Sequence, residues 1–242
     1  MPTVLSVQSW VACGNVGNTA ALFPLQRLGC ETWSLNTVAF SNHTGHERWR
    51  GDTVPARQIA TLFDGIAELG VLPRCDAVLS GYLGEAETGP VLLDIVARVK
   101  EANPRALYCC DPVMGDVGLG YYVRSGIPEF FRDRALARAD VVTPNRFELE
   151  RLSGKPVRSL AEAFRAAEAV RQCGPAIVLA TSLETDTENV AAIAAGPDGA
   201  WAVETPRLPI EATIHSGGGE LALVEAQDEL VSPSRPVAVR RL

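Results

Sequence analysis

Short apolar runs rich in β-branched residues alternate along this chain with segments whose apolar residues recur at helical spacing. The runs that predict strands cover residues 3–9, 32–40, 76–82, 106–113, 140–145 and 175–183. Strands of this kind, separated by helices, are typical of a mostly parallel sheet that is covered by helices on both faces. The pattern therefore predicts an α/β protein.

Three of the intervening segments carry apolar residues at the spacing i, i+3, i+4 and i+7, which predicts amphipathic helices. The apolar positions are Ile59, Leu62, Phe63 and Ile66 in the first, Leu92, Ile95, Val96 and Val99 in the second, and Leu160, Ala163, Phe164 and Ala167 in the third. Start and stop signals bound each helix. These are Pro55 and Gly70 for the first, Pro90 and Asn103 for the second, and for the third a capping box of Ser159 and Glu162 with an exit at Gly174.

From residue 189 onward the pattern changes to two strand-like runs joined across residues 196–199, which reads as a hairpin. The chain contains no linker, internal repeat or low-complexity block. With 242 residues and 47% hydrophobic content it can bury one substantial core. We expect residues 1–242 to form a single domain.

The charge balance excludes several classes of partner. The formal net charge is −7 and the isoelectric point is near 5.1, so the basic surface that nucleic-acid binders need is missing. Any bound phosphate must be held locally by backbone amides, helix ends or a metal ion. No segment resembles a membrane span or a secretory signal, which predicts a cytoplasmic protein with no membrane partner.

The six cysteines show no CxxC spacing and mostly lie in apolar runs, which predicts buried free thiols in place of disulfides or a zinc site. In open parallel sheets, ligands bind beyond the carboxyl ends of the strands. The polar residues at those ends are therefore candidates for one shared site, although the same residue types also serve as turns and caps. They are Ser9, Thr44, Tyr82, Asp111, Asn145 and Thr181.

Six blocks of the sequence closely resemble the pyridoxal kinase family of the bacterial PdxY type, within the ribokinase-like superfamily. They are VQSWVACGNVGNTAALFPLQRLG, SNHTGHERW, LSGYLG, CDPVMGD, TPNRFELE and GPAIVLATSL, and they follow one another in family order. The resemblance implies a three-layer α/β/α sandwich. It also implies ATP-dependent phosphorylation of the 5′-hydroxymethyl group of pyridoxal, with Mg²⁺, in a homodimer that serves vitamin B6 salvage.

On the substrate side, the resemblance implies that Ser9 hydrogen-bonds the polar edge of the pyridine ring. The alternative is that Ser9 caps the helix that follows. Thr44 and Gly45 match the segment that folds over the substrate, although this segment could instead be only a turn or a dimer contact. Tyr82 matches the loop beside the ring, and a tyrosine suits a small aromatic ligand because it offers a flat apolar face and one polar tip.

On the nucleotide side, the resemblance implies that Asp111 lies near the phosphates and that Asn145 and Glu148 form the NxxE element that positions Mg²⁺. Asp111 and Glu148 are the expected metal residues, acting through water and phosphate, as is usual for Mg²⁺. Two acids at adjacent strand ends repel each other unless a cation joins them. The other ATP-contact positions that the resemblance implies are Thr143, Thr181, Pro206, Arg207 and Leu208.

Cys13 to Gly17 follow a strand and contain two glycines, which raises the alternative of a dinucleotide-binding loop. The third glycine of that motif is absent, and no acidic residue ends the next strand. An NAD-dependent enzyme is therefore disfavoured.

The carboxyl end departs from the family pattern. Family kinases place Gly-Thr/Val-Gly-Asp after the hairpin, where backbone amides meet the γ-phosphate and the aspartate accepts the substrate proton. Here Gly217, Gly218, Gly219 and Glu220 occupy that place, and residues 221–230 resemble the family's final strand. The intervening helices are therefore expected to be missing, which would uncover one face of the sheet. A dimer partner or refolding of residues 210–242 could hide that face.

Three functions remain open from the sequence. The first is a pyridoxal kinase whose activity is impaired by the altered loop, with Glu220 as a stand-in for the aspartate. The second is a catalytically inactive protein that binds pyridoxal or pyridoxal phosphate. The third is a sibling kinase for hydroxymethylpyrimidine, which the HTGHERW and GYLG segments disfavour.

Overall fold

The computed structural model describes residues 1–184 and 189–206, and the backbone of residues 238–241. Its centre is a ten-stranded sheet in the order β12-β11-β10-β9-β8-β5-β4-β1-β2-β3, and β6 and β7 form a separate small hairpin. The strands are β1 (Thr3–Val11), β2 (Glu31–Phe40), β3 (Gly51–Thr53), β4 (Ala77–Ser80), β5 (Leu107–Cys110), β6 (Gly115–Asp116), β7 (Gly120–Tyr121), β8 (Val141–Val142), β9 (Ile177–Glu184), β10 (Asn189–Gly196), β11 (Gly199–Pro206) and β12 (Ala238–Arg241). The six neighbours from β2 to β9 are parallel, whereas β3, β10, β11 and β12 each pair antiparallel.

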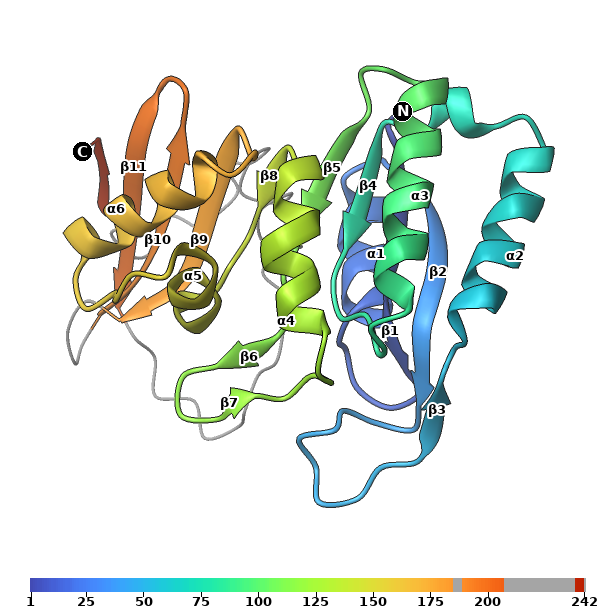
Figure 1. The fold of residues 1–242 in the computed structure, drawn as a ribbon, viewed down its shortest axis with the longest axis horizontal. Coiled ribbons are helices and arrows are strands. Elements are labelled where there is room, and N and C mark those ends of the chain that lie inside the picture. The colour runs from blue at the N-terminus through green and yellow to red at the C-terminus, as the bar shows by residue number, and fades with distance from the viewer. Residues whose placement is uncertain (185–188, 207–237, 242) are drawn as a thin grey trace.

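Helices cover both faces of this sheet, which confirms the predicted layers. Figure 1 shows α1 behind the sheet and the longer later helices in front of it. The helices are α1 (Asn18–Arg27), α2 (Ala56–Glu68), α3 (Thr88–Ala102), α4 (Ile127–Phe130), α5 (Arg146–Ser153) and α6 (Leu160–Arg171), with short helical turns η1 (Leu72–Arg74), η2 (Phe131–Ala135) and η3 (Leu136–Arg138). In the part of the chain described above, no helix is both long and apolar enough to cross a membrane.

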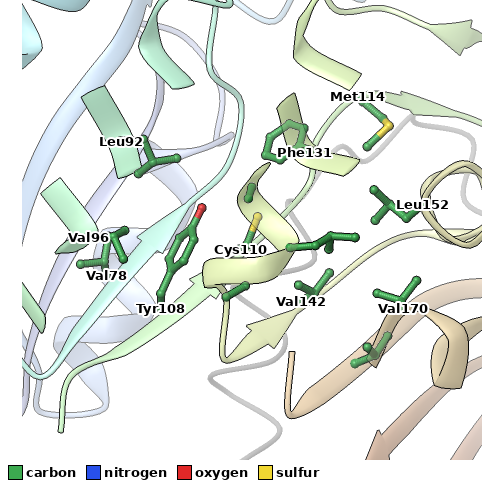
Figure 2. Close-up of a cluster of buried hydrophobic side chains, with 14 of the residues drawn as sticks. Val78, Leu92, Val96, Tyr108, Cys110, Met114, Phe131, Val142, Leu152 and Val170 are labelled. Carbon is green, nitrogen blue, oxygen red and sulfur yellow. The ribbon is translucent and has the colours of Figure 1, made fainter. Parts of the chain in front are cut away.

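The two faces of the sheet bury different side chains, because successive strand residues point to opposite sides. Tyr108 and Cys110 of β5 belong to the large core under the front helices, whereas Cys109 packs with Ala21 and Leu25 of α1. Figure 2 shows the large core, where side chains of β4, β5 and β8 meet those of α3, η2, α5 and α6. This core fixes the strands whose ends carry the candidate site.

Most predicted elements are confirmed, with corrections at their boundaries. The second predicted helix begins at Thr88, ahead of Pro90. Leu62 lies on the solvent side of α2 and is 50% exposed, because only one side of that helix faces the sheet. The third helix ends at Arg171, so Gly174 lies beyond its cap, in a conformation with φ of +150° where it packs against Leu136 and Ala137.

The predicted capping box at Ser159 is half formed. The Ser159 side chain accepts a hydrogen bond from the backbone N–H of Glu162, but the Glu162 carboxylate accepts from Arg158 in place of Ser159. All six cysteines are free, as predicted, but only Cys75, Cys109 and Cys110 are buried. The expected hairpin is formed by β10 and β11, with Gly196 opposite Gly199.

The carboxyl ends of the parallel strands meet at one edge of the sheet, the lower edge in Figure 1, and we call this edge the rim. The loop between β2 and β3 and the hairpin of β6 and β7 both lie there. Strand β11 runs parallel to β9, because each is antiparallel to β10, so Pro206 also ends at the rim. The rim therefore gathers polar residues from distant parts of the chain.

Candidate active site

Two buried carboxylates lie at the centre of the rim. Asp111 directly follows β5 and is 3% exposed, and Glu148 in the first turn of α5 is 2% exposed. The pKa of Glu148 is raised well above its usual value, first by burial and then by the negative charge of Asp111. Backbone N–H groups at Asn145, Met114 and Gly115 oppose this rise in the pKa of Glu148. A cation placed between these acids would relieve their repulsion.

The NxxE element is itself a helix cap. The Asn145 side chain accepts a hydrogen bond from the Glu148 backbone N–H at 2.9 Å, and the Glu148 carboxylate accepts one from the Asn145 N–H at 2.9 Å. The Asn145 amide also donates to the Gly115 carbonyl at 2.9 Å, and Met114 N–H donates to Glu148 at 3.0 Å. These bonds hold α5 against the segment after β5. Asn145 and Glu148 therefore stabilise the shape of the site in addition to lying in it. Sequence analysis did not predict this capping box.

Thr181 reaches the rim through a bulge in β9. The pairing of β9 with β10 slips between Ala191 and Ile193, and Ser182 takes a φ of +55°, which is rare for a residue with a side chain. Thr181 then bridges to Asn145, and its N–H donates to the Pro144 carbonyl at 3.0 Å. The structure thus brings Asp111, Asn145, Glu148 and Thr181 together, as predicted.

Thr143, between β8 and Asn145, is 1% exposed, and its backbone N–H donates to the Cys110 carbonyl. Its hydroxyl oxygen is buried and has no hydrogen-bond partner among the described residues. A buried hydroxyl is costly to leave unpaired. Together with the two crowded acids, this hydroxyl fits a site that holds a ligand with a cation.

Two residues that sequence analysis did not single out join the acids. Tyr122 follows β7 and is 46% exposed as a whole residue, yet burial of its hydroxyl end and then the charges of Glu148, Asp111 and Asp116, in that order, raise its pKa. The backbone N–H of Tyr122 donates to the Met114 carbonyl at 3.2 Å. The CDPVMGD block contains Asp116, so that acid could have been found from the sequence. Tyr122 could not, because no local signal marks it.

The other half of the rim is apolar. Val11, Val38 and Phe40 form a small buried cluster, against which Val16 and Tyr82 pack. Ser9 lies close by and is 8% exposed. A flat ring would suit this cluster, with Tyr82 as one wall.

Ser9 lies directly against Gly17, at the start of α1. A Cβ on Gly17 would collide with the backbone carbonyl and side chain of Ser9, and the φ of Gly17 is +53°. Gly17 is the N-cap of α1, and within residues 1–184 and 189–206 no side chain makes a capping hydrogen bond to that helix. The alternative of Ser9 as a helix cap is therefore wrong.

Thr44 and Gly45 lie in the loop between β2 and β3, and both are exposed. The Gly45 N–H donates to the His43 ring at 3.0 Å, and the His46 N–H donates to the His43 carbonyl at 3.1 Å. The segment thus forms a tight turn, in line with one of the alternatives above. Its folding over a substrate stays a prediction.

The nucleotide side is described only in part. Pro206 ends β11 at the rim and is exposed. Arg207, Leu208, Gly217, Gly218, Gly219 and Glu220 lie outside the described residues. Their predicted roles, and the altered loop with them, stay predictions.

Comparison with known proteins identifies the fold and the family. The model of the phosphomethylpyrimidine kinase family matches residues 17–222. A pyridoxal kinase PdxY of Rubrobacter xylanophilus is 46% identical over an alignment of 281 positions, which covers 99% of this chain and 97% of that protein. The PdxY of Granulibacter bethesdensis is 50% identical over 226 positions, covering 90% of this chain and 78% of that protein. This chain belongs to the pyridoxal kinase family.

Solved structures of pyridoxal kinases share the fold. The enzyme of Leishmania donovani in complex with ADP and pyridoxamine superposes with a TM-score of 0.85 at 31% identity, covering 95% of this chain and 81% of that one. The pyridoxal kinase of Trypanosoma brucei gives a TM-score of 0.79 at 30% identity, covering 90% and 77%. The ribokinase-like α/β/α fold that the resemblance implied is therefore confirmed.

The pyridoxal kinase family, to which this chain belongs, consists of kinases that transfer phosphate to an alcohol group. The expected Mg²⁺ can be tested against the site. Among the residues that the structure describes, no group of three or more His, Cys, Asp or Glu side chains could hold a metal. The pair Asp111 and Glu148 still fits Mg²⁺, because this ion keeps much of its water and takes few protein ligands.

Proposed function

We propose that this chain is a pyridoxal kinase that transfers the γ-phosphoryl group of ATP to the 5′-hydroxymethyl group of pyridoxal at a reduced rate. The observation that carries the proposal is the division of the rim into two halves. One half holds the buried acids Asp111 and Glu148 with the Thr143 hydroxyl, for which the described part of the chain offers no hydrogen-bond partner. The other half is the apolar cluster beside Ser9 and Tyr82. A phosphate donor and an aromatic alcohol need these two environments side by side.

The chain's own groups have distinct tasks in this proposal. Asp111 and Glu148 would hold Mg²⁺ through water, and the ion would neutralise charge on the transferring phosphate. Asn145 holds Glu148 in place through its cap, and Thr143 and Thr181 present hydroxyl groups to the nucleotide side. Ser9 binds the polar edge of the ring, and Tyr82 orients its flat face. Thr44 and Gly45 complete the substrate side.

The proposed reduction in the rate of phosphoryl transfer rests on the altered sequence after the β10–β11 hairpin. The alignment with the Rubrobacter protein has 281 positions against 242 residues here, so at least 39 positions of that alignment have no counterpart in this chain. A difference of this size is what the proposed loss of the helices after the glycine loop would produce. A glycine loop with no helix behind it offers weaker amide donors and a weaker helix dipole to the transferring phosphoryl group. Glu220 then replaces an aspartate with a side chain that is one methylene longer, and a misplacement near 1 Å can cost about a hundredfold in rate.

Exposed apolar side chains support the same proposal. Leu107 of β5 and Ile177 of β9 point away from the large core, towards the α1 side of the sheet. They are 52% and 40% exposed. Missing helices would leave such side chains uncovered.

The decisive experiment combines binding with turnover. Pyridoxal binding is followed by its absorption spectrum, and ADP formation is measured with Mg²⁺ and ATP in the presence and absence of pyridoxal. Slow ADP release that depends on pyridoxal and is lost in Asp111→Asn supports the kinase. Binding without any ADP release would instead establish the inactive binding protein. Turnover of hydroxymethylpyrimidine in preference to pyridoxal would contradict the substrate assignment.

The proposal also includes a homodimer, as the family resemblance implies, and a cytoplasmic location. Light scattering measures the mass in solution, and cell fractionation measures the location. A monomer at micromolar concentration would contradict the first part, and recovery in a membrane or secreted fraction would contradict the second.

A further inference from the structure

The loop that carries Tyr82 is tied to a strand that is not its neighbour in the sheet. The Thr37 hydroxyl, in the middle of β2, donates a hydrogen bond to the backbone carbonyl of Tyr82 at 2.6 Å. Strand β1 lies between β4 and β2, so the chain that leaves β4 must cross β1, at Gln8, to reach Thr37. Thr37 is fully buried, with an exposure of 0%. This bond therefore fixes where the Tyr82 backbone lies.

Close packing reinforces this contact. A Cβ on Gly81 would lie 2.5 Å from the Gln8 amide oxygen on β1, so the loop rests directly on that side chain. Gly84 has a φ of +76°, and a Cβ there would lie 2.7 Å from Val38 and 3.1 Å from the Thr37 carbonyl oxygen. The positive φ and the close approach to Val38 and Thr37 require glycine at position 84. The loop consequently follows the surface of β1 and β2 without a gap.

A second anchor holds the far end of the loop. The Glu85 carboxylate accepts a hydrogen bond from the backbone N–H of Ala56, at the start of α2, at 3.0 Å. Its other oxygen accepts from the Thr53 hydroxyl at 3.4 Å. The loop of residues 81–85 is thus fastened at Thr37 and at Glu85. Tyr82 is the residue held at the first anchor, three positions before the second.

We propose that Thr37 is a positioning residue that sets the affinity for the aromatic vitamer by holding Tyr82 against the apolar cluster of Val11, Val38 and Phe40. The inference rests on the proposed function, since it assumes that this cluster receives the ring. Thr37 does not touch the ligand itself, because its hydroxyl is engaged with the Tyr82 carbonyl. Its effect passes through the backbone of Tyr82 to the ring, which packs against the apolar cluster.

The position of Thr37 separates its effect from phosphoryl transfer. Two strands, β1 and β4, lie between β2 and β5, whose end carries Asp111. A change at Thr37 should therefore alter binding of pyridoxal and leave the binding of ATP unchanged. In kinetic terms this raises the KM for pyridoxal with little change in kcat.

The test uses three variants of the full chain. Thr37→Val removes the hydroxyl but keeps the shape, whereas Thr37→Ser keeps the hydroxyl and removes a methyl group. Thr61→Val is the matched control, because it removes a hydroxyl that bonds within α2, to the Arg57 carbonyl at 2.9 Å, on the exposed side of that helix. We expect the dissociation constant for pyridoxal and its KM to rise about tenfold in Thr37→Val, the size of one lost hydrogen bond. Thr37→Ser and Thr61→Val should stay within about twofold of the parent.

A readout that needs no catalysis separates this inference from the proposed function. Hydrogen exchange of the peptide spanning residues 81–88 should become faster in Thr37→Val and not in Thr37→Ser. If the parent chain neither binds nor phosphorylates pyridoxal, the proposed function fails, and the exchange data still decide whether Thr37 holds the loop. If the parent binds pyridoxal and Thr37→Val binds it equally well, or lowers kcat and ATP binding to the same extent, the inference is wrong.

Discussion

Glu148 and Asp111 are two buried carboxylates whose charges interact: burial raises the pKa of Glu148 most, and the negative charge of Asp111 raises it further. An acid whose pKa is higher in the folded than in the unfolded protein favours folding most at low pH. This contribution is lost as the pH rises from the unfolded pKa through the raised folded pKa, because the buried group must then ionise. Ionised Glu148 should therefore lower the free energy of unfolding at neutral and alkaline pH when no cation is bound.

We expect Asp111→Asn to stabilise the protein at alkaline pH while it abolishes turnover. Without the second charge, Glu148 ionises more easily, so the melting temperature at pH 8 should rise by roughly 2–4 °C, equivalent to about 1 kcal/mol. At pH 5, which is closer to the usual pKa of a glutamate and where ionisation of Glu148 costs less, the shift in melting temperature should be smaller. Thermal melts with a chelator and without ATP measure both. Asp133→Asn, at an exposed pair with Arg132, is the control, and equal shifts of Asp111→Asn at the two pH values would contradict the prediction.

Replacing Asn145 should lower both stability and activity, whereas replacing Ser159, the cap of α6, should lower stability alone. Asn145→Ala removes the cap of α5 and the bond to Gly115, so we expect about 1–2 kcal/mol of lost stability together with loss of turnover. Ser159→Ala removes the cap of α6, away from the acids, and should cost about 1 kcal/mol with turnover unchanged. Urea unfolding and ADP assays on both variants provide the comparison. If the two variants lost the same stability and the same activity, Asn145 would have no role beyond capping.

Gly17 should be sensitive because of Ser9. Gly17→Ala places a methyl group into the Ser9 backbone, so we expect Ser9 to move and pyridoxal to bind at least tenfold more weakly. Gly29→Ala meets nothing within 4 Å at a φ of +82° and should show only the backbone strain of about 1 kcal/mol. Spectral titration with pyridoxal measures the difference. Unchanged pyridoxal affinity in a folded Gly17→Ala would show that Ser9 is not held by this contact.

Glu220 should carry the remaining activity if it replaces the family aspartate. Glu220→Gln keeps the size of the side chain but removes the base, so residual ADP formation should fall by roughly 10²–10⁴ while pyridoxal binding is retained. Glu225→Gln is the matched control from the same segment. A chimera with a complete Gly-Thr-Gly-Asp loop and the following helices should regain activity. A folded chimera without activity would place the fault elsewhere in the pocket.

Much of the fold could be predicted from local patterns. The strand at 76–82 and the hairpin around Gly196 and Gly199 follow from apolar runs and turn residues, which act over a few positions. The predicted helix boundaries differ from the structure, since α3 begins at Thr88 ahead of Pro90 and α6 ends before Gly174. Helix ends depend on packing against neighbours, as Gly174 against Leu136 shows.

The sequence predicted which residues belong to the candidate site better than it predicted how they are arranged. Asp111 and Glu148 were named from the family motifs, but the capping box of Asn145 and Glu148 was missed even though its spacing is visible. The bulge that turns Thr181 towards Asn145 has no counterpart in the sequence pattern, because it depends on the register between β9 and β10. Tyr122 joined the site only through its folded position beside the acids.

By itself, the sequence determined the class of fold, the order of the elements and the family, because periodicity, turn chemistry and motifs are properties of neighbouring residues. The tertiary structure alone decided that Thr37 bonds to Tyr82 across an intervening strand and that Asp111 perturbs Glu148. Such relationships depend on strand order, register and burial. Burial removes water from a charge or a hydroxyl, and only the folded chain establishes which groups lose it.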